Sequence, residues 1–191
     1  ADFDTIQAAV DAASDGDEIL VMPGTYTGSG DEVVNMLGKA VTLRSSNPSD
    51  PDVVAATIID GEGVRRGIVC FNNETEQTLI KGLTITNGHA VEFDPADEAI
   101  HERSNCGGGM FCFDSNPTIE DCMFNHNTTS QIVAQASMGG GMFCFDSNSE
   151  ITRCMFSDNT ALYAGGGFCC VSSNLLISNC TFSNNDGGDE G

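Results

Sequence analysis

The sequence predicts an all-β solenoid of short parallel strands, with a short α-helix covering its N-terminal end. Three observations lead to this fold: a segment that occurs three times, apolar segments of three to five residues bounded by turn formers, and 22 glycines among 191 residues. Segments that short and rich in β-formers are typical of strands. One repeat cannot bury its own apolar face, so successive repeats are expected to stack.

The repeat begins with three glycines. The ten letters GGGMFCFDSN at residues 107–116 return unchanged at residues 139–148, and a looser copy, GGGFCCVSSN, occupies residues 165–174. Each copy continues with an Ile, a Cys three residues later, a Phe two residues after that, and an Asn three residues beyond the Phe. Stacking such strands in register predicts a right-handed parallel β-helix, in which each repeat position forms a column with a spacing of about 4.8 Å.

Asparagine and cysteine are expected to form such columns. Asn tolerates left-handed backbone at bends, and its amide can bond to the copies above and below. We interpret each repeated Cys position as one core position that recurs in every coil and holds a small buried hydrophobic side chain. Disulfide bonds are the second interpretation, and both are favoured over zinc ligation. The expected Asn columns are Asn116, Asn148 and Asn174, and Asn127, Asn159 and Asn185. The expected Cys columns are Cys112, Cys144 and Cys170, and Cys122, Cys154 and Cys180.

The first 30 residues predict a cap and the first coil. Residues 4–7 indicate a helix start with a capping Gln7, and Ile6, Val10 and Ala13 share one face of a short helix. Residues 18–22 are expected to be a strand. A helix over the first coil would cover strand edges and core that an open end exposes.

The whole chain is expected to be one domain. Irregular coils are assigned to residues 31–88, an inserted loop to residues 89–106 and the three repeats to residues 107–191. The C-terminal residues offer no apolar cap, so the last coil is expected to be open.

The composition excludes several partners. With 28 acidic against 7 basic residues, the net charge is −21, which repels nucleic-acid backbones and anionic membranes. No stretch approaches the roughly 20 consecutive apolar residues that cross a bilayer, so direct membrane insertion is not expected. Nine cysteines exceed ordinary cytosolic use. Cys106 and Cys169 lie outside the two columns and are the candidates for pairing or cross-linking.

Several motifs resemble the pectin-lyase-like right-handed β-helix proteins of bacterial surfaces and secretions. The resemblance lies in residues 5–13, 16–17, 23–26, 41–44 and 82–88. The Gly-Gly-Gly-Met and Phe-x-x-Asn pairs resemble the repeats of chlamydial polymorphic membrane protein adhesins. The resemblance implies a secreted or cell-surface protein with a structural or adhesive role, from which a signal segment has been removed. It does not imply one activity, because this fold hosts lyases, hydrolases, esterases, adhesins and fibres.

Polysaccharide-cleaving relatives supply the alternative function, a polysaccharide-binding or polysaccharide-degrading module. Thr27-Gly28 stands where pectin methylesterases carry Glu, and only Asn87-Gly-His89 approaches a polygalacturonase motif. No Arg-rich pectate lyase motif is present. We therefore expect no catalytic residues and a non-enzymatic protein, whose partners are further copies of itself, as in a filament or surface fibre, or cell-surface glycans.

Metal binding is not expected, nor is any cofactor. His89, His101 and His126 are scattered without metal-ligand spacing. An acidic stretch in the inserted loop could hold Ca²⁺ through hard oxygen ligands, although a solvated acidic loop is the favoured interpretation. The weak Ca²⁺ candidates are Glu92, Asp94, Asp97, Glu98 and Glu102.

Three asparagines fit the N-glycosylation acceptor pattern: Asn73, Asn127 and Asn179. Of these we expect Asn127, which follows a strand in an inserted turn, to be the most accessible.

One pattern suggests a partner. The repeated Met-Phe-Cys-Phe segments are apolar at every position, and alternate side chains of a strand point to opposite faces of the sheet. If Met and Cys point inward, the phenylalanines therefore point outward. A sheet that is apolar on both faces needs something on its outside. The inserted loop is the first choice for this cover, and another subunit or sugar rings are the alternative. The residues expected to contact such a partner are Phe111, Phe113, Phe143 and Phe145.

Overall fold

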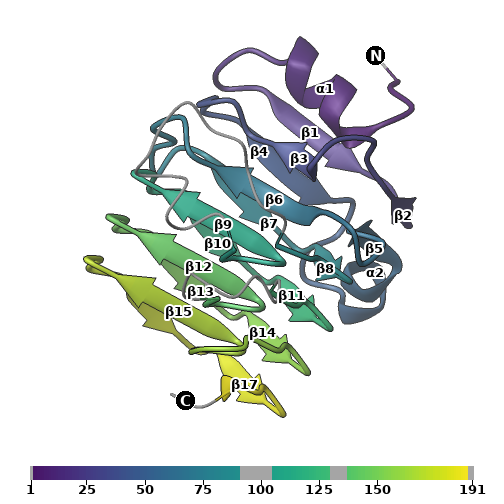
Figure 1. Ribbon diagram of the computed structural model, residues 1–191. Helices are drawn as coiled ribbons and strands as arrows, with labels where there is room; N and C mark the ends of the chain where they lie inside the picture. Colours follow the sequence, from purple (N-terminus) through teal and green to yellow (C-terminus); the bar gives the residue numbers. More distant parts are fainter. Residues whose placement is uncertain (1, 91–104, 130–136, 189–191) are drawn as a thin grey trace.

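The structure is a computed structural model that describes residues 2–90, 105–129 and 137–188. In these ranges the strands form three parallel sheets that wind around one interior (Figure 1). Each coil of the chain adds one strand to each sheet in turn, as the repeat predicted. The two ends of the solenoid lie at opposite ends of the stack (Figure 1).

We name the sheets A, B and C. Sheet A contains β1 (Glu18–Val21), β4 (Thr42–Ser45), β7 (Leu79–Lys81), β10 (Thr118–Glu120), β13 (Glu150–Thr152) and β16 (Leu176–Ser178). Sheet B contains β2 (Gly24–Tyr26), β5 (Thr57–Asp60), β8 (Thr84–Thr86), β11 (Met123–Asn125), β14 (Met155–Ser157) and β17 (Thr181–Ser183). Sheet C contains β3 (Glu32–Asn35), β6 (Arg66–Cys70), β9 (Met110–Phe113), β12 (Met142–Phe145) and β15 (Phe168–Val171).

The register turns repeat positions into columns of like side chains. In sheet B the middle positions of β11, β14 and β17 pair directly, so Phe124, Phe156 and Phe182 form one stack. Their ring centroids lie 4.8 and 4.9 Å apart with nearly parallel planes. In sheet A one column runs through Ile19, Leu43, Ile80, Ile119, Ile151 and Ile177. These two columns and the inward residues of sheet C fill the interior.

Helix α1 (Ile6–Ala12) covers the start of the solenoid, as expected, but its cap differs from the prediction. The N-cap is Thr5, whose Oγ1 accepts a hydrogen bond from the Ala8 amide at 3.1 Å. Gln7 does not cap the helix, because its side chain bonds to β3 instead. At the other end, Lys39 Nζ donates to the carbonyl oxygens of Val10, Asp11 and Ala13. A cation there satisfies carbonyls that the helix itself leaves open.

A second helix, α2 (Pro51–Ala56), lies between β4 and β5 and was not predicted. Asp50 is its N-cap and Pro51 occupies its first turn, which is where proline suits a helix. Val54 is its buried residue, and the Val54 carbonyl accepts a bond from Thr84 Oγ1 of β8. The local start signals were present in the sequence, but the apolar run after them reads equally well as a strand.

The bends use left-handed backbone one or two residues before the expected positions. His126, Asp158 and Asn184 have φ near +55°, and each directly precedes an Asn of the predicted column. In the other column, Asp114 and Asp146 have the same conformation and stand two residues ahead of Asn116 and Asn148. The prediction that the column asparagines themselves adopt this conformation is therefore wrong. Their amides are used for bonding between coils, and the preceding residue makes the turn.

The glycine triplets allow close approach between coils. Gly139 has φ +67°, and a Cβ placed on Gly141 would collide with the Gly167 carbonyl oxygen of the next coil. The positions directly before each strand of sheet C in the three repeats therefore have no room for a side chain.

Candidate functional site

The column of Asn127, Asn159 and Asn185 is a hydrogen-bonded ladder. Asn127 Nδ2 donates to Asn159 Oδ1 at 2.9 Å, and Asn159 Nδ2 donates to Asn185 Oδ1 at 3.0 Å. The backbone amides of Asn127 and Asn159 donate to the same two oxygens. Each Nδ2 also donates to a carbonyl of the preceding coil, on Ile85, Phe124 and Phe156. The ladder therefore ties four successive coils together.

The second Asn column lies at the surface. Asn148 and Asn174 are exposed and Asn116 is half-buried. Asn116 Oδ1 accepts a bond from the Asn148 amide at 2.6 Å, whereas the Asn174 amide donates to the Ser147 carbonyl. The residues align as expected, but the two columns differ in burial and in bonding.

The cysteine columns lie in or beside the interior, and Cys70 adds a further member to one of them. Cys70, Cys112, Cys144 and Cys170 occupy aligned positions of β6, β9, β12 and β15. The described cysteines are all free thiols. Burial raises the pKa of Cys70 and Cys144, and the bond with Cys122 followed by burial raises the pKa of Cys154. Cys170 is exposed and Cys180 half-buried, because they belong to the last two coils.

The outward phenylalanines of sheet C are covered. Phe111 and Phe143 are fully buried, Phe113 is nearly so and Phe145 is half-buried. Their rings stack between coils, with centroids 5.9 Å apart for Phe111–Phe143 and 5.2 Å for Phe113–Phe145. They belong to a cluster separate from the interior, and Phe145 is the most exposed of the four. The predicted cover, residues 89–106, lies for the most part outside the described residues.

Cys106 and Cys169 both belong to this outer aromatic cluster. Cys106 is fully buried, and Cys169 aligns with Phe143 and is half-buried. Burial raises the pKa of Cys169. Both pack against the aromatic rings of this cluster, and no disulfide joins them within the chain.

Arg66 is a buried cation on the same side of sheet C. Its Nε donates to the Cys106 carbonyl at 3.2 Å, and its guanidinium lies 5.5 Å from the centre of the Phe111 ring. Burial lowers its pKa to about 10. Burial likewise raises the pKa of Glu32, which lies opposite Arg66 in the strand register. Sequence reasoning missed this residue, although an Arg opening an apolar strand was a signal for it.

Glu74 is a buried carboxylate that also escaped prediction. Its Oε1 accepts from the Gly38 amide at 2.9 Å, and its Oε2 accepts from the Asn72 amide at 2.9 Å and from Ser115 Oγ at 2.8 Å. These donors lie in three successive coils. The carboxylate therefore serves as a structural acceptor between coils.

A cluster of charges lies on the outer face of sheet A. Lys81 Nζ is 2.7 Å from Glu120 Oε2, and Arg153 Nη2 reaches the same oxygen at 3.1 Å. Arg153 also holds Asp121 through two hydrogen bonds, which raise the pKa of the arginine. Farther along the sheet, Arg44 makes two bonds to Glu18. Each cation of this row is thus engaged by carboxylates, an arrangement that links neighbouring coils.

The two described histidines, His89 and His126, lie in different surroundings. His89 Nδ1 lies 2.9 Å from Thr128 Oγ1, and burial followed by the charge of Arg66 lowers its pKa. His126 is exposed. Among the residues described, no three His, Cys, Asp or Glu side chains are placed to hold a metal ion. His101 and the Ca²⁺ candidates Glu92, Asp94, Asp97, Glu98 and Glu102 lie outside the described residues.

The glycosylation expectation changes most at Asn127. Its side chain is fully buried within the ladder, so its amide nitrogen is not accessible. Asn73 and Asn179 are exposed, both on left-handed backbone. Accessibility therefore favours these two over Asn127.

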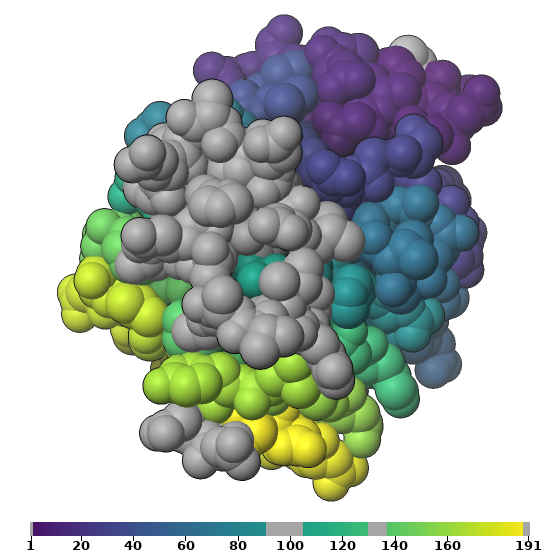
Figure 2. Space-filling view, viewed as in Figure 1, coloured from purple at the N-terminus to yellow at the C-terminus, as the bar shows by residue number. Residues whose placement is uncertain are grey.

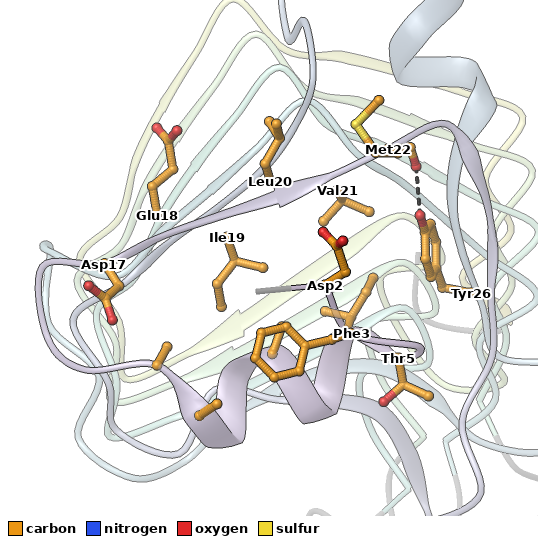
Figure 3. A pocket seen from close by; sticks show the side chains of 14 residues that line it. Asp2, Phe3, Thr5, Asp17, Glu18, Ile19, Leu20, Val21, Met22 and Tyr26 are labelled. Carbon is orange, nitrogen blue, oxygen red and sulfur yellow. Dashed lines mark hydrogen bonds between the residues drawn. The ribbon is translucent and has the colours of Figure 1, made fainter.

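A hollow lies at the N-terminal end of the described chain, between α1 and β1. Its volume is about 660 Å³. Figure 3 shows Ile19, Phe3 and Tyr26 around it, with Tyr26 donating a hydrogen bond to the Met22 carbonyl at 2.9 Å. The hollow lies beside the first coil, where residues of α1 and of β1 form its walls. Its rim carries carboxylates of Asp2, Asp17 and Glu18.

Sequence comparison identifies the family to which this architecture belongs. Residues 66–189 match the family described as the right handed beta helix region, and the chain belongs to that family. Comparisons with curated proteins and with solved structures give no significant match. None of the described helices is both long and apolar enough to cross a membrane.

Proposed function

We propose that this protein is a non-enzymatic structural or adhesive β-helix protein of the extracellular space or cell surface, and that it associates with itself. The observation that carries this proposal is the behaviour of the interior columns. In the last described coil Ile177 and Phe182 are exposed, and their strands pair in register with those of the preceding coil.

The bonding of polar side chains supports a structural role. Asn159, Glu74 and Arg153 each bridge coils through hydrogen bonds or ion pairs. Such bridges hold the body rigid along its axis, as a spacer or fibre subunit requires. Buried amide and carboxylate groups that are fully bonded in this way are costly to disrupt.

Solution size tests the proposal directly. Sedimentation velocity and negative-stain microscopy of the 191-residue chain should show association that grows with protein concentration. It should strengthen between about 0.02 and 0.5 M salt, since screening weakens repulsion between copies that each carry a charge of −21. A monodisperse monomer throughout this range would overturn the self-association.

One observation favours a second candidate, a polysaccharide-binding module. Arg44 and Lys81 lie on sheet A and Arg153 lies in the turn directly after β13, in a protein with far more acidic than basic residues. A row of cations and carboxylates on a flat sheet could bond to successive sugar hydroxyls. Glycan arrays and uronate-release assays on the wild type and on Lys81→Ala distinguish this role. Binding lost in the variant would favour it, and absence of binding to acidic and neutral glycans would exclude it.

A further inference from the structure

We propose that the C-terminal coil of one copy docks on the N-terminal end of a second copy of this chain. In this contact β16 lies beside β1 of the second copy, β17 lies beside its β2, and its α1 lies beyond β15. The inference rests on the self-association proposed above and specifies which surfaces make it.

The three sheets do not all end in the same coil. This difference gives the N-terminal and C-terminal ends of the solenoid complementary shapes. Within residues 2–90, 105–129 and 137–188, sheets A and B each have six strands and finish with β16 and β17, whereas sheet C has five and finishes one coil earlier with β15. At the opposite end α1 packs on β3, so a helix occupies the place that one more sheet C strand would take. Stacking the ends would therefore bring α1 of the second copy to the vacant position next to β15.

The interior columns would continue across this contact. Ile177 belongs to the sheet A column that begins with Ile19, and Phe182 belongs to the sheet B column that begins with Tyr26. Phe182 is 48% exposed and lies at the free edge of the stack. In the docked pair its ring would meet Tyr26 of the second copy, which lines the hollow in Figure 3.

Both ends expose apolar side chains that this contact would bury. Ile177 is exposed at the last described coil and Phe3 beside the hollow, and Leu176 and Leu20 are exposed on the outer face of the two end strands of sheet A. In Figure 2 the yellow atoms of β17 and the purple atoms of the N-terminal segment lie at opposite extremes of the molecule. The two end surfaces of the described chain therefore cannot pack against each other within one copy.

A second copy fits these ends better than an unrelated partner does. The side-chain columns of the first and last coils are already aligned by the strand pairing within the chain, so the same alignment can continue from one copy to the next. The contact uses two different surfaces, so it repeats without closing and yields linear filaments. Carboxylates of Asp2, Asp17 and Asp186 lie near the two surfaces and oppose docking at low salt.

Complementation between variants tests the head-to-tail geometry. Phe182→Asp places a charge on the C-terminal surface, and Met22→Asp places one on the N-terminal rim. Val64→Asp is the control, because Val64 is as exposed as Met22, at 56%, but lies in the turn between β5 and β6. Each variant is measured by sedimentation velocity, alone and in a 1:1 mixture, at the salt concentration where wild type associates.

The expected result is specific to two unlike surfaces. Phe182→Asp and Met22→Asp should each be monomeric, their mixture should form a dimer and nothing larger, and Val64→Asp should form filaments as wild type does. Leu176→Asp and Leu20→Asp repeat the test on the two end strands of sheet A, β16 and β1, if circular dichroism shows that a first variant is unfolded.

Three results would overturn the inference. A monomeric wild type removes this contact together with the proposed self-association, and leaves the ends to another partner. Filaments that persist in both end variants leave self-association standing but place it elsewhere on the surface. Dimers of one end variant by itself, with no gain on mixing, indicate a contact between two like ends.

Discussion

The side-chain amide of Gln7 pairs with both backbone groups of Asn35. Gln7 Oε1 accepts from the Asn35 amide at 2.7 Å, and Gln7 Nε2 donates to the Asn35 carbonyl at 3.2 Å. Asn35 ends β3, the first strand of sheet C, whose outer edge has no strand beside it. At this edge the Gln7 side chain thus forms the backbone hydrogen bonds that a neighbouring strand forms elsewhere in the sheet. These two bonds hold α1 against the solenoid.

Gln7→Ala should loosen α1 from β3. Both bonds to Asn35 are lost, which is expected to cost about 1–3 kcal/mol locally. Hydrogen exchange of the Asn35 amide should accelerate by roughly tenfold or more, since each 1.4 kcal/mol corresponds to about tenfold. Gln77→Ala is the control, because the Gln77 side chain is exposed. Unchanged protection at Asn35 would show that packing alone holds the helix.

Asn159→Ala should destabilise the body of the solenoid. It removes the acceptor of two bonds from Asn127 and the donor of bonds to Asn185 and Phe124. Buried groups left unbonded cost about 1–3 kcal/mol each, so the urea midpoint should fall clearly. Asn148→Ala, in the exposed column, should change stability by about 0.5 kcal/mol or less. Equal effects of the two variants would contradict the structural distinction between the columns.

Thiol labelling should separate the cysteines by coil. Cys170 is exposed and should react first with a water-soluble thiol reagent, whereas Cys112 and Cys144 are buried and should react only on unfolding. Burial also raises the pKa of Cys144 and reduces its reactive thiolate. Cys170→Ser should remove the fast phase. Fewer than nine reactive thiols in the denatured, unreduced protein would reveal disulfides and contradict the free thiols of the structure.

Stability should fall on acidification through His89. Burial, followed by the charge of Arg66, lowers its pKa below the ordinary 6.5, so the folded protein binds this proton less readily than the unfolded chain. The contribution is therefore complete above pH 6.5 and is lost as the pH falls through the lowered pKa.

His89→Asn should flatten this region of the stability curve, measured by urea unfolding between about pH 7.5 and 5. His126→Asn is the control for replacing a histidine, because His126 is exposed. An identical slope in wild type and His89→Asn would rule out the assignment.

Much of the fold could be predicted because a repeat carries its own register. Once residues 107–116 and 139–148 are identical, stacking them aligns Phe124 with Phe156 and Asn127 with Asn159. The capping helix was predictable from its apolar spacing. Helix α2 was not, since six residues with an apolar run satisfy a helix and a strand equally.

The candidate site was less predictable, because burial and bonding depend on residues far apart in the chain. Asn127 fits a glycosylation pattern, yet coils 32 residues and more away enclose its amide. Gln7 looked like a helix cap, but it bonds to a strand 28 residues later. Periodicity within the chain thus specifies which residues align. Which of them are buried, bonded or free to meet a partner follows only from the packing of distant segments against one another.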